Sequence, residues 1–177
     1  MSESTEKKMV RLRSSDGEVF EVEESVAKVA KTLQDMLEED CADAVIPITC
    51  VRAPILTKVI DYCKDQVMIS SSSSTTNNPN ERTEQERKAW GQKFMEGVDS
   101  STLCELLVAS NFLNIEGLLN LGVDKMVSMI QGKYPQEIRD MFNVVNDFTP
   151  EEEEEIRNQN AWAFERDPYY KKRSSSK

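Results

Sequence analysis

Residues 9–22 read MVRLRSSDGEVFEV, and this stretch decides the fold of the N-terminal part of the chain. Apolar and charged residues alternate on both sides of Asp16-Gly17, with the apolar positions at Val10, Leu12, Phe20 and Val22. A period of two is typical of a strand with one buried face. An Asp-Gly pair between two such runs favours a tight turn. The stretch therefore predicts a β-hairpin.

The hydrophobic period changes immediately after the hairpin. Residues 23–40 predict one amphipathic helix, because their apolar side chains recur at helical spacing, at Val26, Val29, Ala30, Leu33, Met36 and Leu37. Residues 45–49, VIPIT, predict a short strand, which Pro47 places at a sheet edge or at a strand start. Residues 53–67 predict a second helix with one apolar face. The first 68 residues are thus expected to form a mixed αβ module.

Residues 69–87, ISSSSSTTNNPNERTEQER, have no apolar periodicity. A segment of Ser, Thr, Asn and charged residues cannot bury enough apolar surface to order itself, so a disordered loop is predicted.

The chain from 99 to 164 is helical in pattern. Ser101 is the predicted N-cap of a helix over TLCELLVASNFL, and Gly117 and Gly122 are predicted to divide the following residues into short helices. Pro135 is predicted to open the next helix, PQEIRDMF. Short helices of this kind cannot cover one another completely, so we expect exposed apolar surface for a partner.

Residues 148–164 read FTPEEEEEIRNQNAWAF, and the glutamate run permits two interpretations. It is either a solvated acidic tail or the first turns of a helix. Thr149 as N-cap, Pro150 at the first helical position and Glu152 three residues after the cap favour the helix. The far end of this predicted helix presents Trp162.

Composition excludes several classes of function. The net charge of −10 argues against a nucleic-acid surface, which needs clustered Lys and Arg. No window approaches 18 consecutive apolar residues, and the polar start MSESTEKKMV lacks the apolar stretch of a signal peptide. We therefore expect an intracellular protein.

The chain has no histidine, which removes the commonest general base and the usual catalytic triads. Its four cysteines show no paired CxxC spacing, so a zinc site would need all four as ligands. Reduced and mostly buried thiols are the simpler expectation. An enzyme that uses Cys41 or Cys50 as nucleophile has nothing beyond these cysteines in its favour.

Several long motifs, in order, resemble one known family. They are SSDGEVFEVEE, VIDYCK, TLCELLVASNFLNIEGLL and MIQGKYPQEIRDMFNVVNDFTPEEEEEIRNQNAWAFE. Over about 9–165 the chain is similar to the S-phase-kinase-associated adaptor family, and it resembles the plant-type sequences most. Members of that family are the linker subunit of SCF (adaptor–cullin–F-box) ubiquitin ligases.

The resemblance implies an α+β fold, a BTB/POZ-type αβ domain followed by C-terminal helices. The expected organisation is a flexible N-terminus at 1–8, the BTB/POZ-type domain at 9–131 with a disordered loop at 69–87, C-terminal helices at 132–165 and a disordered tail at 166–177.

The resemblance also implies two protein partners and no cofactor. A cullin scaffold, which carries the RING subunit, is expected at Asn111 and Phe112. The expected F-box-binding residues are Leu113, Ile115, Leu118, Leu119, Ile130, Ile138, Met141, Phe142 and Trp162. Each of these also has a simpler interpretation as core. The implied role is a non-catalytic adaptor that promotes ubiquitination and degradation of targets, in nucleus and cytoplasm.

The chain departs from the family pattern at a few positions. Phe112 stands where tyrosine is usual, and Cys104 stands where the family has phenylalanine, a change expected to leave space in the helix packing. Gly97 is an apparent insertion, and the tail after Glu165 adds a weak basic cluster at Lys171, Lys172 and Arg173.

The alternative from another class is an elongin-C-like or self-associating BTB interaction protein. That kind of chain ends near the BTB fold, so the segment FNVVNDFTPEEEEEIRNQNAWAFE separates the two hypotheses.

Overall fold

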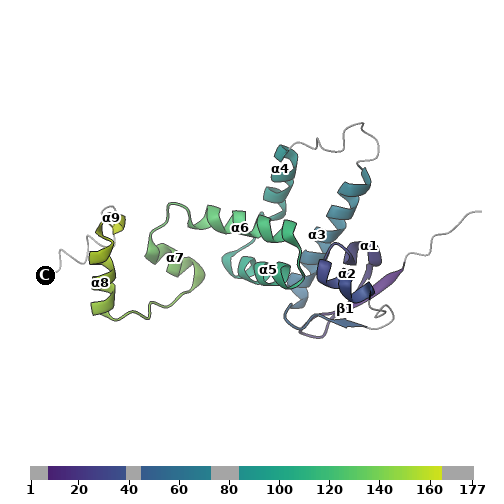
Figure 1. The fold of residues 1–177 in the computed structure, drawn as a ribbon, viewed down its shortest axis with the longest axis horizontal. Helices are drawn as coiled ribbons and strands as arrows, with labels where there is room; N and C mark the ends of the chain where they lie inside the picture. Colours follow the sequence, from purple (N-terminus) through teal and green to yellow (C-terminus); the bar gives the residue numbers. More distant parts are fainter. Residues whose placement is uncertain (1–7, 39–44, 73–83, 165–177) are drawn as a thin grey trace, which may run out of the picture. The chain divides into compact units, whose positions relative to one another are not determined.

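The computed structural model describes residues 8–38, 45–72 and 84–164 of the chain. The chain divides into two compact units, Met1–Val127 and Ser128–Lys177. Figure 1 shows their helices and strands. The first unit contains a small sheet and most of the helices. The second unit contains three further helices, α7 to α9.

The predicted hairpin is confirmed. Strands β1 (Met9–Arg13) and β2 (Val19–Glu23) are antiparallel, and Val10 pairs with Val22. Gly17 has a φ of +92° in the connecting turn, a conformation that favours glycine. Strand β3 (Ile46–Pro47) runs parallel to β1 at the opposite edge, in the order β2-β1-β3, so Pro47 lies in an edge strand as predicted.

The prediction of one helix over 23–40 is wrong, because the structure has two, α1 (Glu24–Ala27) and α2 (Lys31–Glu38). Between them the amides of Val29 and Ala30 donate hydrogen bonds to carbonyls three residues earlier in the chain. This tighter turn ends α1. The Thr32 amide then donates to the carbonyl of Leu113 (3.3 Å), a contact distant in sequence. Four of the predicted apolar residues are nevertheless buried: Val26, Ala30, Leu33 and Leu37.

Helix α3 (Ala53–Ser72) begins at a side chain of the hairpin turn, because the Ala53 amide donates to Asp16 Oδ1 (2.9 Å). The predicted loop at 69–87 is wrong at both ends. Residues 69–72 belong to α3, and residues 84–87 belong to α4 (Glu84–Phe94). The rest of that prediction, 73–83, lies outside the described residues.

An aromatic cluster packs α4 onto α3. The ring of Trp90 stacks on Phe94 (centroids 5.4 Å apart), and Tyr62 of α3 contacts both rings at 5.6 and 5.7 Å. Ring pairs at these separations contribute stabilising free energy in addition to that from the apolar area that they bury.

Helix α5 (Ser100–Phe112) is capped by Asp99 rather than by the predicted Ser101. Asp99 Oδ1 accepts the amide of Thr102 at 2.8 Å, and hydrogen bonding to Thr102 lowers the pKa of the Asp99 carboxyl. The inner side of α5 is buried at Leu103, Leu106, Ala109 and Ser110.

Helix α6 (Glu116–Ile130) is continuous, so the predicted division at Gly117 and Gly122 is wrong. These glycines allow close packing instead. A Cβ at Gly117 would lie 2.3 Å from Tyr62 Oη, and one at Gly122 would lie 2.6 Å from Leu107 Cδ2. Both distances are shorter than van der Waals contact.

The second unit consists of α7 (Pro135–Phe142), α8 (Pro150–Gln159) and α9 (Ala161–Phe164). Pro135 opens α7, and the Thr149–Glu152 capping box opens α8, so both predictions are confirmed. Trp162 lies on α9, because α8 ends at Gln159. In α7 and α8, both described in full, no residue is buried.

The sheet and its surrounding helices, followed by a helical segment, confirm the α+β fold class. None of the helices in the described part of the chain has the length and apolarity that a bilayer crossing requires.

Candidate functional site

The two predicted scaffold-binding residues lie on the surface. Asn111 and Phe112 are in the last turn of α5, and Phe112 is 40% exposed. Thr32 holds this turn in place, since its hydroxyl donates to the Phe112 carbonyl (3.0 Å) and its amide to the Leu113 carbonyl. The two side chains therefore project from a fixed backbone.

The predicted F-box residues in the first unit divide into two groups. Leu113, Ile115 and Leu118 are core residues, with at most 3% of the surface of each residue exposed, which is the core interpretation that the sequence also allowed for them. Leu113 lines a small apolar hollow together with Leu56, Val59 and Cys63 of α3. Leu119 is half-buried and remains available at the surface.

Helix α6 carries an exposed apolar stripe, of which only part belongs to the predicted F-box residues. Val123 and Val127 are 46% and 50% exposed, and they continue at helical spacing from Leu119 toward half-buried Ile130. Their helical spacing from Leu119 is the sequence signal from which Val123 and Val127 could have been predicted.

In the second unit, Ile138, Met141 and Phe142 of α7 are half-buried, and Trp162 is 77% exposed. Further apolar side chains, absent from the sequence prediction, are exposed here: Val144, Val145, Phe148 and Ile156. Three of them lie in the connection between α7 and α8, where no helical period marks them. This much apolar surface on one small unit indicates a protein-binding surface.

The glutamate run forms a solvated face of α8. Glu152 caps the helix, and Glu153 pairs with Arg157 at 2.8 Å. Glu151, Glu154 and Glu155 line a shallow hollow with Asn158 and Gln159. Hydrogen bonds from Thr149 lower the pKa of Glu152.

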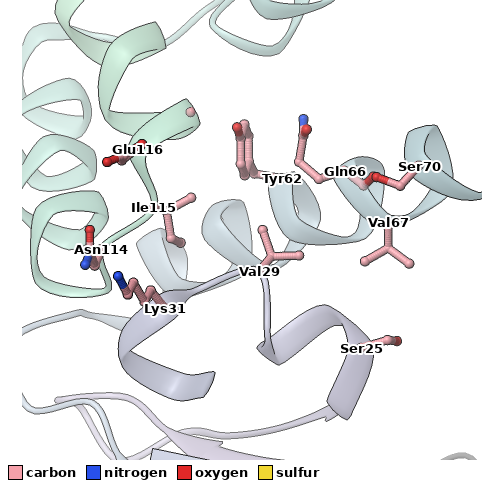
Figure 2. Close-up of a pocket in the computed structure, with 11 residues that line it drawn as sticks. Ser25, Val29, Lys31, Tyr62, Gln66, Val67, Ser70, Asn114, Ile115 and Glu116 are labelled. Atoms are coloured by element: carbon pink, nitrogen blue, oxygen red, sulfur yellow. The ribbon is translucent and has the colours of Figure 1, made fainter. Parts of the chain in front are cut away.

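An open groove of about 920 Å³ lies in the first unit between α1, α3 and the start of α6 (Figure 2). Its charged lining residues are Lys31 and Glu116, and the other lining side chains are apolar or neutral. Burial raises the pKa of Tyr62, which reaches the groove, to about 12, so its hydroxyl is protonated at neutral pH.

The cysteines do not form a site among the described residues. Cys63 is buried, and burial raises the pKa of its thiol to about 12. Cys50 and Cys104 are exposed, so the expectation of mostly buried thiols is wrong for these two. Within the described ranges no three His, Cys, Asp or Glu side chains are grouped to hold a metal, and Cys41 lies outside those ranges.

Exposure of Cys104 also corrects the expected packing defect. A small side chain on the outer face of α5 leaves no internal space to fill, so the cost of cavity formation does not arise.

These features define a class of protein: a small BTB/POZ-like α+β unit with appended helices whose apolar faces remain exposed, which is the form of a protein-interaction module. Two family models match the chain, the Skp1 family tetramerisation domain over residues 8–68 and the Skp1 family dimerisation domain over residues 116–163. The chain belongs to the Skp1 family, in a plant-type form.

Its relatives are similar over almost their whole length. SKP1-like protein 1A of Arabidopsis thaliana is 48% identical over 158 residues, which cover 89% of this chain and 98% of the relative. SKP1-like protein 13 of the same plant is 49% identical, covering 89% and 99%. SKP1-like protein 1 of Oryza sativa subsp. japonica is 46% identical, covering 93% and 100%. The resemblance found in the sequence motifs is confirmed, and membership of this family supports an SCF adaptor role.

Proposed function

We propose that this chain is the non-catalytic adaptor that bridges a cullin scaffold and F-box substrate receptors, and thereby promotes ubiquitination and proteasomal degradation of receptor-bound targets. The observation that carries the proposal is the exposed apolar surface of the second unit, where neither α7 nor α8 buries a residue.

On the receptor side, the F-box would cover the stripe of α6 and the apolar side chains of the second unit. An aromatic side chain such as Trp162 buries about 200 Å² when covered, which at about 25 cal/mol per Å² contributes up to about 5 kcal/mol. A few such residues suffice for a tight complex. The exposed glutamates of α8 add little, about 0–1 kcal/mol for each exposed ion pair.

On the scaffold side, the cullin would contact Asn111 and Phe112 of α5. Phe112 keeps the ring of the tyrosine that is usual in the family but lacks its hydroxyl. Where that hydroxyl makes a hydrogen bond, its loss costs about 1 kcal/mol.

The adaptor is proposed to act in nucleus and cytoplasm, which imaging of the tagged chain would test.

Trp162 supplies a direct readout of receptor binding. In a Trp90→Phe variant, Trp162 is the remaining tryptophan, because the chain has two. Adding an F-box peptide should shift its emission to the blue as the ring leaves water, and coexpression should yield a 1:1 complex. Trp162→Ala should weaken binding at least about tenfold, and Val19→Ala, an exposed residue of β2, should not.

A folded chain that forms no complex with any F-box protein tried would count against the proposal. The elongin-C-like alternative is disfavoured, because the match to the Skp1 family includes residues 116–163 and hence α7 to α9. Light scattering on the purified chain tests self-association separately.

A further inference from the structure

The buried side chain of Tyr62 ends in a hydroxyl that has no hydrogen-bond partner among the described residues. The residue is 4% exposed, and its Oη lies against the first turn of α6, 2.3 Å from where a Cβ on Gly117 would be. In the described part of the chain, no polar side-chain atom that is sealed from solvent lacks a partner, so this oxygen opens onto the groove that Tyr62 lines. Because a buried polar side chain usually has a partner, the hydroxyl is available to a ligand in the groove.

The start of α6 offers further hydrogen-bond donors beside this hydroxyl. Ile115, directly before the helix, has an apolar side chain that cannot accept hydrogen bonds from the first-turn amides. Within the described ranges no hydrogen bond engages the amides of Glu116 and Gly117, and both residues line the groove. Amides in the first turn of a helix lie at its positive end and attract an anion. Tyr62 and α6 thus form a group of donors for which the described chain supplies no acceptor.

The charged side chains of the groove lie at this same end. Figure 2 shows Lys31 and Glu116 near the start of α6, whereas Gln66 and Ser70 follow Tyr62 along α3. The charges of Lys31 and Glu116 are opposite and compensate each other, so the positive end of α6 decides which charge is favoured there. An oxygen anion therefore fits this end, and Glu116 is the side chain that opposes it.

Away from this end the groove is uncharged. Its apolar and neutral polar side chains include Val29, Val67, Ile115, Ser25, Gln66 and Ser70. From Tyr62 to Ser70 the helix α3 rises about 12 Å, the length of about four residues of an extended chain. The Gln66 amide can both donate to and accept from the backbone of such a chain. The groove therefore matches an extended ligand with a negative charge at one end only.

We propose that this groove binds the carboxyl terminus of a protein chain whose last residue is apolar. The terminal carboxylate accepts hydrogen bonds from the Tyr62 hydroxyl and from the amides of Glu116 and Gly117, a form of carboxylate capture by backbone amides. The last side chain packs against Ile115 and Val29, and the preceding residues run along α3. This site adds to the function proposed above and does not depend on it.

The first test measures binding of fluorescein-labelled peptides to the full chain by fluorescence polarisation. The peptide Ser-Gly-Ser-Ala-Thr-Val with a free carboxyl terminus should bind with a Kd below about 1 mM, and its amide should bind at least about tenfold more weakly. An amidated peptide that ends in Glu carries its carboxylate on a side chain and should bind as weakly as the first amide. Failure of the free acid to bind, or equal affinity for either amide, would overturn the inference.

The second test changes the groove. Tyr62→Phe keeps the ring contacts and removes the hydroxyl, so it should weaken binding of the free acid about tenfold. Glu116→Gln removes the opposing carboxylate and should tighten binding about threefold. The matched control is Asp124→Asn, which removes the same charge from an exposed position two turns further along α6 and should change affinity less than about twofold.

Circular dichroism and F-box binding verify that each variant is folded. Unchanged affinity of Tyr62→Phe, or weaker binding by Glu116→Gln, would overturn the inference.

Nuclear magnetic resonance locates the bound carboxylate directly. The amide resonances of Glu116 and Gly117 should move downfield when the free acid is added, because both amides gain an acceptor, and the peptide amide should not produce this change. The amide of Val10 in β1 should not move with either peptide. Shifts from the free acid that leave Glu116 and Gly117 unchanged would overturn the inference.

Discussion

Gly122 shows at the scale of one residue how tertiary contact overrides a local signal. Glycine inside a helical pattern commonly marks a break, yet here α6 continues through it. The reason is the neighbouring helix: Leu107 of α5 occupies the space that a Cβ would need. The absence of a side chain sets how closely α5 and α6 approach.

Replacement of Gly122 tests this interpretation. Gly122→Val should lower the free energy of unfolding by about 1–3 kcal/mol, because the added methyl groups overlap Leu107. Asn120→Val, on the exposed side of the same helix, should stay within about 0.5 kcal/mol. Urea unfolding of both variants measures the difference. Equal stability of the two would show that the glycine serves no packing role.

Helix α5 shows at the scale of one element where sequence signals compete. Asp99, Ser100 and Ser101 are all residue types that cap helices, and the structure selects Asp99. Its backbone is extended (φ −78°, ψ 170°), as a cap requires. Ser101 is within the helix and exposed.

Two alanine variants separate these assignments. Asp99→Ala should lower the Tm by about 2–4 °C, as loss of an N-cap does in a chain of this size. Ser101→Ala should leave the Tm nearly unchanged. Differential scanning calorimetry at pH 7 distinguishes them, and the reverse order would restore Ser101 as the cap.

The effect of Asp99→Ala should depend on pH in one direction. Because hydrogen bonding to Thr102 lowers the pKa of Asp99 in the folded chain, the folded state favours the ionised carboxylate. The stabilisation is present above the unfolded pKa of about 3.9 and is lost as pH falls through the folded pKa. The Tm difference between the unsubstituted chain and Asp99→Ala should therefore shrink below about pH 4. A difference that grows in acid would contradict the assignment.

At the scale of the whole molecule, the two units differ in how they are stabilised. The first has a dense core, with Leu12, Leu56 and Leu103 at most 2% exposed. In the second, the fully described helices α7 and α8 bury no residue. The second unit is therefore expected to open more readily than the first.

Hydrogen exchange tests this difference on the full chain. Amides of 135–159 should exchange much faster than those of β1 and α5. At an F-box concentration of 100 times Kd, exchange in 135–159 should slow by up to about 100-fold, while β1 changes little. Strong protection of α7 and α8 before the receptor is added would contradict the expected dependence on a partner.

Some elements follow from local sequence signals. The alternation around Asp16-Gly17 specified the hairpin, Pro135 the start of α7, and Thr149 with Glu152 the capped glutamate helix, because each depends on neighbouring residues alone. Long motifs also identified the family. These signals cover the parts of the fold that a short segment can encode.

Tertiary structure decided the rest, because it depends on residues far apart in the chain. The carbonyl of Leu113 accepts a hydrogen bond from the Thr32 amide and so contributes to the break between α1 and α2. The side chain of Leu107 occupies the space beside Gly122, so this glycine serves close packing within a continuous α6. The same long-range packing buries Leu113, Ile115 and Leu118 and leaves Val108, Val123 and Val127 exposed. Helical spacing shows which side chains share a face, whereas only the packed neighbours decide which face remains open to a partner.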